Sequence, residues 1–172
     1  MENTSKQAVV DALLRLLESK TLSAISISEL AREAKVSRMT IYRNYRSKED
    51  VFKVYLKDVL IQYKQDTGKR YGMGSYCDKE NIVHCFGYFS KHKRFLDGVL
   101  KSGYGHIFLE AVDRYVMETW WKEGEGRKKE YRLHAFSGAL YNLYISWAAN
   151  GYTETPEEMA DILERMRFED SV

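Results

Sequence analysis

Residues 26–52 read SISELAREAKVSRMTIYRNYRSKEDVF. Ser26, Ser37 and Ser47 each stand just before a helix-forming run, where a serine hydroxyl can accept a hydrogen bond from an unpaired backbone N–H. Glu29 follows Ser26 at capping-box spacing, which strengthens the first of these helix starts. The segment therefore predicts two short helices joined by a tight turn at Val36, followed by a longer helix.

The middle helix of this segment, over about residues 37–45, has an inward and an outward face. Ile41 and Tyr45 are four residues apart, so both lie on one side and are expected to pack onto the neighbouring helices. The side chains on the other side then face solvent or a ligand. They are Met39, Thr40, Tyr42 and Arg43.

These outward side chains have the chemistry that the major groove of DNA requires. Arg43 can donate two hydrogen bonds to a guanine edge, and Met39 can contact a thymine methyl group. Thr40 can bond a base or a phosphate, and Tyr42 is expected to donate to a phosphate. The pattern predicts that this helix reads DNA sequence.

Charge is distributed unevenly along the chain. Residues 1–70 carry 14 Lys and Arg against 9 Asp and Glu, or +5, whereas residues 71–172 carry 13 against 16, or −3. Between Lys35 and Lys48 cations occur without an acidic residue, which favours contact with phosphate. A basic face that is merely solvated has the same composition, and the helix pattern decides in favour of DNA. Arg38 and Lys48 flank the middle helix and are predicted to contact phosphates.

Helical spacing continues on both sides of this segment. Apolar residues from Thr4 to about Lys20 predict an N-terminal helix, and those after Ser47 predict a long helix that connects two halves. Further helices are expected over about residues 78–91, 94–101, 105–121 and 128–150. A capping box at Thr155, with proline at the first helical position, starts a last helix. We therefore expect an all-α protein whose last two helices form a hairpin.

The short helices resemble the DNA-binding domain of the tetracycline repressor (TetR) family of transcriptional regulators. The resemblance covers about residues 6–60 and rests on Ala-x-Val-Ser, Thr-Ile-Tyr and Tyr-x-Ser-Lys-Glu at the family's spacings. Lys35 stands where the family usually has glycine, which implies a left-handed backbone at a cost of about 1 kcal/mol, and Tyr45 replaces phenylalanine. The DNA contacts implied by the resemblance, with the cap Ser37, give the predicted site: Ser28, Ser37, Arg38, Met39, Thr40, Tyr42, Arg43, Asn44 and Lys48.

The resemblance also implies an organisation and a function. We expect a three-helix helix-turn-helix domain, residues 1–47, and a helical effector-binding and dimerisation domain, residues 48–172. A homodimer is expected to bind a palindromic operator as a repressor, and a small molecule to release it. The last two helices carry the predicted subunit interface, although the same residues would also seal the core of one subunit. They are Ala135, Gly138, Ala139, Asn142, Ile145, Met159, Ile162, Leu163 and Met166.

The C-terminal part, residues 71–172, contains 18 of the 23 aromatic residues. Most are expected to pack the interior, because aromatic residues at helical spacing are more often core than ligand contacts. A pocket for an apolar or aromatic effector is expected among these helices, with a few polar groups in its wall. Its candidate residues are Tyr63, His84, Tyr88, His106, Tyr115 and Asn142. The alternative is a constitutive DNA-binding factor without an effector.

Other classes of protein find less support. A metal-dependent enzyme would draw on the cysteines, three histidines and one glutamate: Cys77, His84, Cys85, His92, His106 and Glu110. No pair among them has zinc-finger or zinc-protease spacing, so no catalytic residue, metal site or cofactor is expected. Two cysteines are too few for a disulfide framework. The N-terminus lacks a signal-peptide core, and the longest apolar stretch is too short to span a bilayer, so a cytoplasmic protein is expected.

Overall fold

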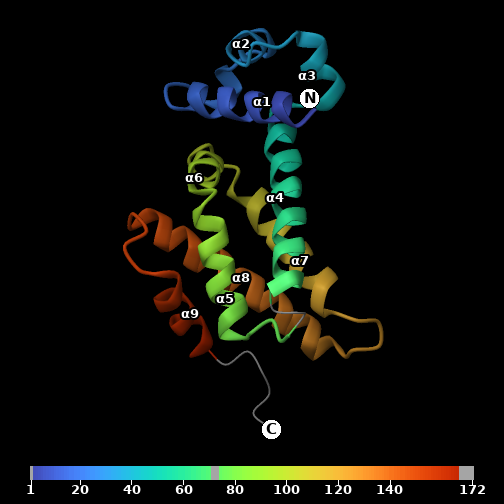
Figure 1. Ribbon diagram of the computed structural model, residues 1–172, viewed down its shortest axis with the longest axis vertical. Coiled ribbons are helices and arrows are strands. Elements are labelled where there is room, and N and C mark those ends of the chain that lie inside the picture. Colours follow the sequence, from blue (N-terminus) through green and yellow to red (C-terminus); the bar gives the residue numbers. More distant parts are fainter. Residues whose placement is uncertain (1, 71–73, 167–172) are drawn as a thin grey trace.

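The computed structural model describes residues 2–70 and 74–166, and all regular structure within them is helical, as the sequence predicts. Figure 1 shows α1–α3 at one end of the molecule and α5, α8 and α9 at the other, with α4 leading from one to the other. No helix in the described ranges has the length and apolar character needed to cross a membrane. The elements are α1 (Glu2–Leu17), the 3₁₀ helix η1 (Leu22–Ala24), α2 (Ile27–Glu33), α3 (Arg38–Asn44), α4 (Lys48–Arg70), α5 (Lys79–Ser90), α6 (Lys93–Lys101), α7 (Gly105–Trp120), α8 (Arg127–Ala149) and α9 (Pro156–Glu164).

The N-terminal three-helix unit has its own apolar centre. Leu13 of α1, Leu30 of α2 and Ile41 of α3 are almost completely buried. Helix α1 ends at Leu17 rather than near Lys20, because the chain tightens there into bonds between residues three apart, such as Glu18 N to Arg15 O. The three helices thus form a small platform on which α3 is held by its buried side.

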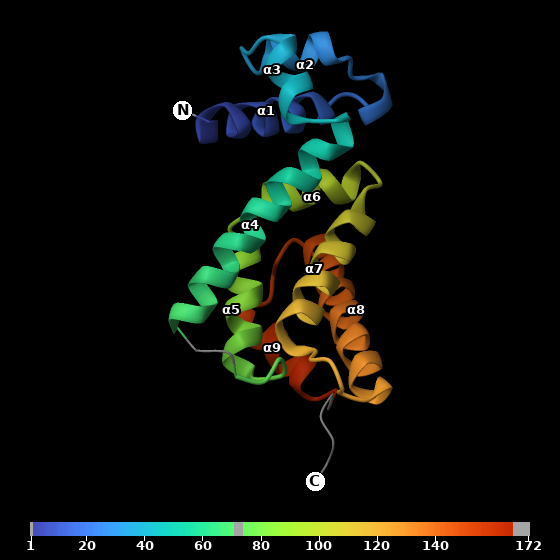
Figure 2. The same ribbon diagram turned by 90° about the vertical axis from the view of Figure 1, so that its right-hand side faces the viewer.

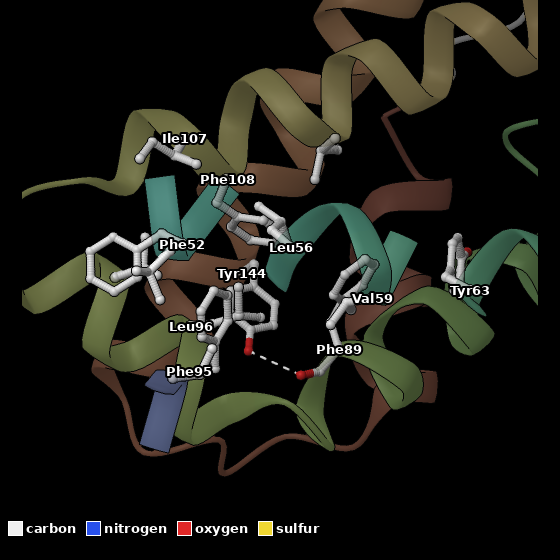
Figure 3. Packing of buried hydrophobic residues seen from close by; sticks show 14 of the residues in the cluster. Phe52, Leu56, Val59, Tyr63, Phe89, Phe95, Leu96, Ile107, Phe108 and Tyr144 are labelled. Atoms are coloured by element: carbon white, nitrogen blue, oxygen red, sulfur yellow. Dashed lines mark hydrogen bonds between the residues drawn. The ribbon is translucent and has the colours of Figure 1, made fainter. Parts of the chain in front are cut away.

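Helix α4 connects this platform to the C-terminal helices (Figure 2). Its apolar residues are buried on more than one side, because it contacts α1, α5 and α7. Figure 3 shows Phe52 and Leu56 of α4 next to Ile107 and Phe108 of α7, and Val59 beside Phe89 of α5. The prediction that the helix after Ser47 connects the two halves is therefore confirmed.

Helix α6 lies under the platform and makes a second contact between the two halves (Figure 2). Gly98 of α6 comes so near to α1 that a Cβ atom at this position would lie 2.4 Å from Leu14 Cδ2. A larger residue there would require the Leu14 side chain to move, because atoms cannot approach to that distance. The platform is therefore supported by both α4 and α6.

The last two helices do not form the predicted hairpin. Helix α8 packs mainly on α7, whereas α9 packs mainly on α5 and is tied to it by an ion pair between Lys79 and Asp161. The connecting loop explains the difference: Trp147 Nε1 donates to Glu154 O at 3.0 Å, and Tyr152, in a left-handed conformation, donates its hydroxyl to Asp97 of α6. The loop is thereby held over α6, and the chain enters α9 alongside α5.

Candidate nucleic-acid interface

The two helices of the candidate DNA-binding unit begin as the sequence predicts. Ser26 Oγ accepts a hydrogen bond from Glu29 N at 3.1 Å, and Ser37 Oγ accepts one from Thr40 N at 3.0 Å. Each bond satisfies a backbone donor that the first turn of a helix leaves unpaired. The starting points of α2 and α3 are thus fixed by their own serines.

The turn between α2 and α3 uses the strained residue that the sequence analysis singled out. Lys35 has φ 54°, which is the left-handed region that glycine normally occupies. Val36 N then donates to Ala31 O at 3.0 Å, which closes the end of α2. The turn redirects the chain sharply, so that α3 crosses the platform with one face exposed.

Helix α3 has the two faces that its spacing predicts. Ile41 is 1% and Tyr45 5% exposed, so both anchor the helix in the platform. Met39 is 65% and Tyr42 61% exposed, and Arg43 is also exposed. Large apolar side chains that are this exposed, next to arginine, form the surface expected of a helix that enters the major groove.

Some of the predicted DNA contacts form hydrogen bonds within α3, and most of the predicted set is exposed. Ser37 and Thr40 share a hydrogen bond of 2.9 Å between their hydroxyls, and Asn44 Nδ2 donates to Thr40 O at 2.7 Å. The side chains of Ser37, Thr40 and Asn44 therefore form hydrogen bonds within α3 that stabilise the helix. The exposed members of the predicted site are Ser28, Ser37, Arg38, Met39, Tyr42 and Arg43.

Lys48 has a different position from the one expected of a phosphate contact. Its ammonium group donates to the carbonyl oxygens of Leu22 at 2.6 Å, Ser23 at 3.3 Å and Ile25 at 2.5 Å. A lysine has three donor protons, so all are engaged within the protein. The structure corrects the phosphate prediction for Lys48: its side chain ties the start of α4 to η1.

The electrostatic surroundings favour a positive surface at α3. On α2, Glu33 pairs with Arg15 at 2.7 Å, and Glu29 pairs with Lys20, which lowers the pKa of the Glu29 carboxyl. Helix α3 itself contains no acidic residue. These two acidic groups of α2 are therefore neutralised by α1 and its following turn, whereas Arg38 and Arg43 remain exposed.

Four of the six predicted effector residues lie together in the C-terminal half. The ring of Tyr63 is stacked on His84, with centroids 5.2 Å apart and an interplanar angle of 13°. Tyr88 and Tyr115 lie 5.1 and 5.2 Å from the same ring. Burial raises the pKa of the Tyr63 phenol well above its ordinary value, so it stays neutral. The other two candidates, His106 and Asn142, are exposed and lie outside this cluster. His106 makes a tilted ring contact with Tyr104, and Asn142 donates to Gly138 O of its own helix.

An internal cavity of about 20 Å³ adjoins this cluster. Tyr63 and Tyr115 line it, whereas His84 and Tyr88 do not. Sequence reasoning missed Asn81, a polar member of the wall, whose Oδ1 is buried without a hydrogen-bond partner among the described residues. Cys85 also lines the cavity, and burial raises the pKa of its thiol to about 12, so it is not an activated nucleophile. Among the residues that the structure describes, no group of three or more His, Cys, Asp or Glu could hold a metal ion.

The residues predicted for the subunit interface separate into buried and accessible ones. Met159 and Leu163 are 3% and 0% exposed, so they belong to the core of the subunit, which corrects their assignment to the interface. Ile162 and Met166 are 42% and 51% exposed. On α8 the accessible or half-buried members are Ala135, Gly138, Ala139, Asn142 and Ile145.

This platform, with two capped helices, a left-handed turn and an exposed basic helix, defines a helix-turn-helix DNA-binding unit. Residues 9–55 match the family described as bacterial regulatory proteins, tetR family, and residues 79–168 match a family described as transcriptional regulator C-terminal region. The chain therefore belongs to the TetR family and is a DNA-binding transcriptional regulator.

Individual relatives agree with this assignment. The HTH-type transcriptional regulator YxbF of Bacillus subtilis (strain 168) is 30% identical over 120 residues, which are 65% of this chain and 30% of that protein. The chain thus matches less than a third of the length of this relative. Lin0861 from Listeria innocua has the same fold, with a TM-score of 0.76 at 15% identity over 95% of this chain and 89% of that one. The fatty acid degradation regulator FadR from Bacillus halodurans has a TM-score of 0.60 at 13% identity over 97% and 96% of the two chains.

Proposed function

We propose that two copies of this chain bind a palindromic operator through α3, repress transcription there, and are released by a small molecule. The exposed face of α3 carries the proposal, because Arg38, Met39, Tyr42 and Arg43 all present their side chains to solvent on it. Arg43 is suited to a guanine edge and Met39 to a thymine methyl group, while Arg38 and Tyr42 are suited to phosphate.

Two copies are needed because one recognition helix reaches only a few base pairs. Two helices related by a two-fold axis read half-sites about one helical turn apart, roughly 34–36 Å, in a palindrome. The proposed contact between the copies is a stripe on α8 formed by the exposed Tyr131, Ala135 and Asn142 and the half-buried Gly138, together with Ile162 of α9. A Cβ atom at Gly138 would meet nothing within 4 Å, so a second helix has room to approach there.

We place the boundary between the DNA-binding domain and the effector domain at residues 47 and 48. Helix α4 starts at this boundary and ends beside α5, so one rigid element belongs to both functions. Lys48 holds its first turn to η1 through three carbonyl oxygens. A displacement of α4 is therefore transmitted to the platform that carries α3.

The effector is proposed to enter the cavity beside Tyr63 and Tyr115. Its walls are mostly apolar and include one unpartnered polar atom, Asn81 Oδ1, which is the composition of a ligand pocket. Because the cavity holds only about 20 Å³, a ligand has to move α4 or its neighbours to fit. A ligand that binds only this widened form shifts the population away from the form that binds DNA.

Fluorescence anisotropy tests both parts of the proposal. Duplexes selected from a random pool should bind, and the logarithm of the affinity should fall linearly with the logarithm of salt concentration through release of counterions. A library of metabolites and drugs is then screened for release of the bound duplex and for a shift in melting temperature. Tight binding with no releasing compound would favour the constitutive alternative, whereas absence of any sequence-preferred duplex would contradict operator binding.

A further inference from the structure

A surface groove runs between α4 and α7 on the outside of the effector domain. It encloses about 420 Å³, within the range of about 300–1,000 Å³ common for small-molecule sites. Its floor is apolar and includes Leu56, Ile61 and Ala111, and Ile61 is 46% exposed although it is a large aliphatic residue. Nearly half of the Ile61 side chain is left uncovered by the described part of the chain, so this part of the groove is open to a ligand.

The groove and the internal cavity share two wall residues. Leu60 of α4 and Tyr115 of α7 line both of them. Both residues are only half-buried. The side chain of each contributes to the wall of the groove and to the wall of the cavity. The groove and the cavity therefore adjoin at Leu60 and Tyr115.

The rim of the groove is predominantly positive. Lys53, Lys57 and Lys64 line it from α4, and Arg114 lines it from α7. Within the described residues none of these four cations forms an ion pair, although two carboxylates, Glu110 and Glu118, lie on the α7 side of the same groove. Four cations against two acids leave a net positive rim around an apolar floor, which is complementary to an anion that carries an apolar body.

We propose that the effector of this regulator is an anionic amphiphile that binds with its charged head at Lys57 and Lys64 and passes its apolar body between Leu60 and Tyr115 into the cavity. This inference rests on the proposed effector gating and adds the chemical class and the route. A body inserted at this point separates α4 from α7, which is the movement that Lys48 carries to the platform.

The experiment compares four ten-carbon probes that differ in their head: decanoate, decyl phosphate, decan-1-ol and decylamine. Binding is measured by isothermal calorimetry, and release of operator DNA by anisotropy. Entry into the cavity is followed by tryptophan emission, because Trp120 lines the cavity, and a Trp120→Phe variant assigns the signal. Decanoate and decyl phosphate are expected to bind, to change the Trp120 emission and to release DNA, whereas decylamine is not.

A double variant, Lys57→Gln with Lys64→Gln, isolates the charged head site. Both lysines are exposed, so the variant is expected to fold normally. The variant should lower the binding affinity for decanoate by about tenfold and leave the affinity for decan-1-ol unchanged. Lys128→Gln, an exposed lysine of α8 outside the groove, is the matched control and should leave both unchanged.

Three results would overturn the inference: equal binding of decanoate and decylamine, an unchanged decanoate affinity in the double variant, or binding without a change in the Trp120 signal. A fourth concerns the proposed function itself. If other compounds release the DNA and no anionic amphiphile does, this inference fails while effector gating stands. If no compound of any class releases it, effector gating fails as well.

Discussion

Lys48 shows how a single residue can be assigned the wrong task when only its place in the sequence is known. Its position beside the recognition helix and its charge predict a phosphate contact, but its ammonium donates to three carbonyl oxygens of residues 22–25. Long-range hydrogen bonds of this kind leave no local sequence signal. Ser26 and Ser37, in contrast, were predictable because their roles depend on neighbours only a few residues away. The left-handed Lys35 was predicted from the family resemblance, because it stands where glycine is usual.

Replacing Lys48 by methionine separates the two roles. Loss of the ammonium leaves carbonyl groups unsatisfied, so the free energy of unfolding should fall by about 1–3 kcal/mol, and DNA affinity should fall without a change in its salt dependence. A phosphate contact would instead lower the salt slope by about one and leave stability unchanged. Denaturant unfolding and anisotropy at several salt concentrations distinguish these results, with Lys128→Met as the control on an exposed lysine.

Tyr45 is a second residue with a measurable consequence. Its hydroxyl is buried and has no hydrogen-bond partner among the described residues. Because an unsatisfied buried polar group is destabilising, Tyr45→Phe should raise the free energy of unfolding by about 1 kcal/mol. Tyr42→Phe, on the exposed face of the same helix, should change it by less than about 0.5 kcal/mol. A Tyr45→Phe protein no more stable than the wild type in urea unfolding would show that the hydroxyl is satisfied in solution.

The buried phenols also predict how stability depends on pH. Burial raises the pKa of both Tyr45 and Tyr115 from 10.0 to about 12. Below pH 10 the phenols are protonated in the folded and the unfolded chain, so their contribution to stability is fully present there. Above pH 10 the unfolded chain loses these protons first, and stability should fall as the pH approaches 12. Unfolding in urea between pH 8 and 12 should show this decline, and Tyr45→Phe should make it shallower; a flat profile would contradict it.

At the scale of the helices, the sequence predicts where each helix starts and ends better than which other helix it packs against. The capping box at Thr155 is formed as expected, with Glu158 N donating to Thr155 Oγ1 at 3.2 Å. The apolar stripe of α9 nevertheless gave no information on which side another helix would cover. Helix α9 packs on α5 with Met159 and Leu163 buried and Ile162 exposed. The loop before α9 fixes this orientation, because the Tyr152 hydroxyl donates to Asp97.

The proposed contact between α8 helices of two subunits is tested at Gly138. A side chain here meets nothing within the subunit, and glycine is unfavourable inside a helix, so both Gly138→Ala and Gly138→Glu should fold at least as stably as the wild type. Glutamate would place a charge between two closely packed helices, whereas alanine would keep the contact. Sedimentation should show a dimer for the wild type and Gly138→Ala and a monomer for Gly138→Glu. A dimeric Gly138→Glu protein would place the interface elsewhere.

For the whole molecule, the division into a DNA-binding platform and an aromatic C-terminal half could be read from the sequence. Short-range signals, such as caps, apolar spacing and the basic stretch, are concentrated in residues 26–52, and the structure bears out the faces of α3 that they predict. The cavity and the groove could not be read, because their walls combine α4, α5, α7 and α8, which only the tertiary fold brings together. Asn81 and the lysines of α4 become candidates only in that arrangement.

Sequence-specific reading of DNA by α3 is the central claim, and Arg43 tests it most directly. Affinities of the wild type and Arg43→Ala are measured by anisotropy on the selected duplex and on a scrambled duplex of equal composition. Arg43→Ala should lose about 1–3 kcal/mol of binding free energy on the selected duplex and much less on the scrambled one. The variant should therefore discriminate less between the two sequences. An equal loss on both duplexes would contradict base reading by Arg43 and reduce α3 to a helix that binds only the DNA backbone.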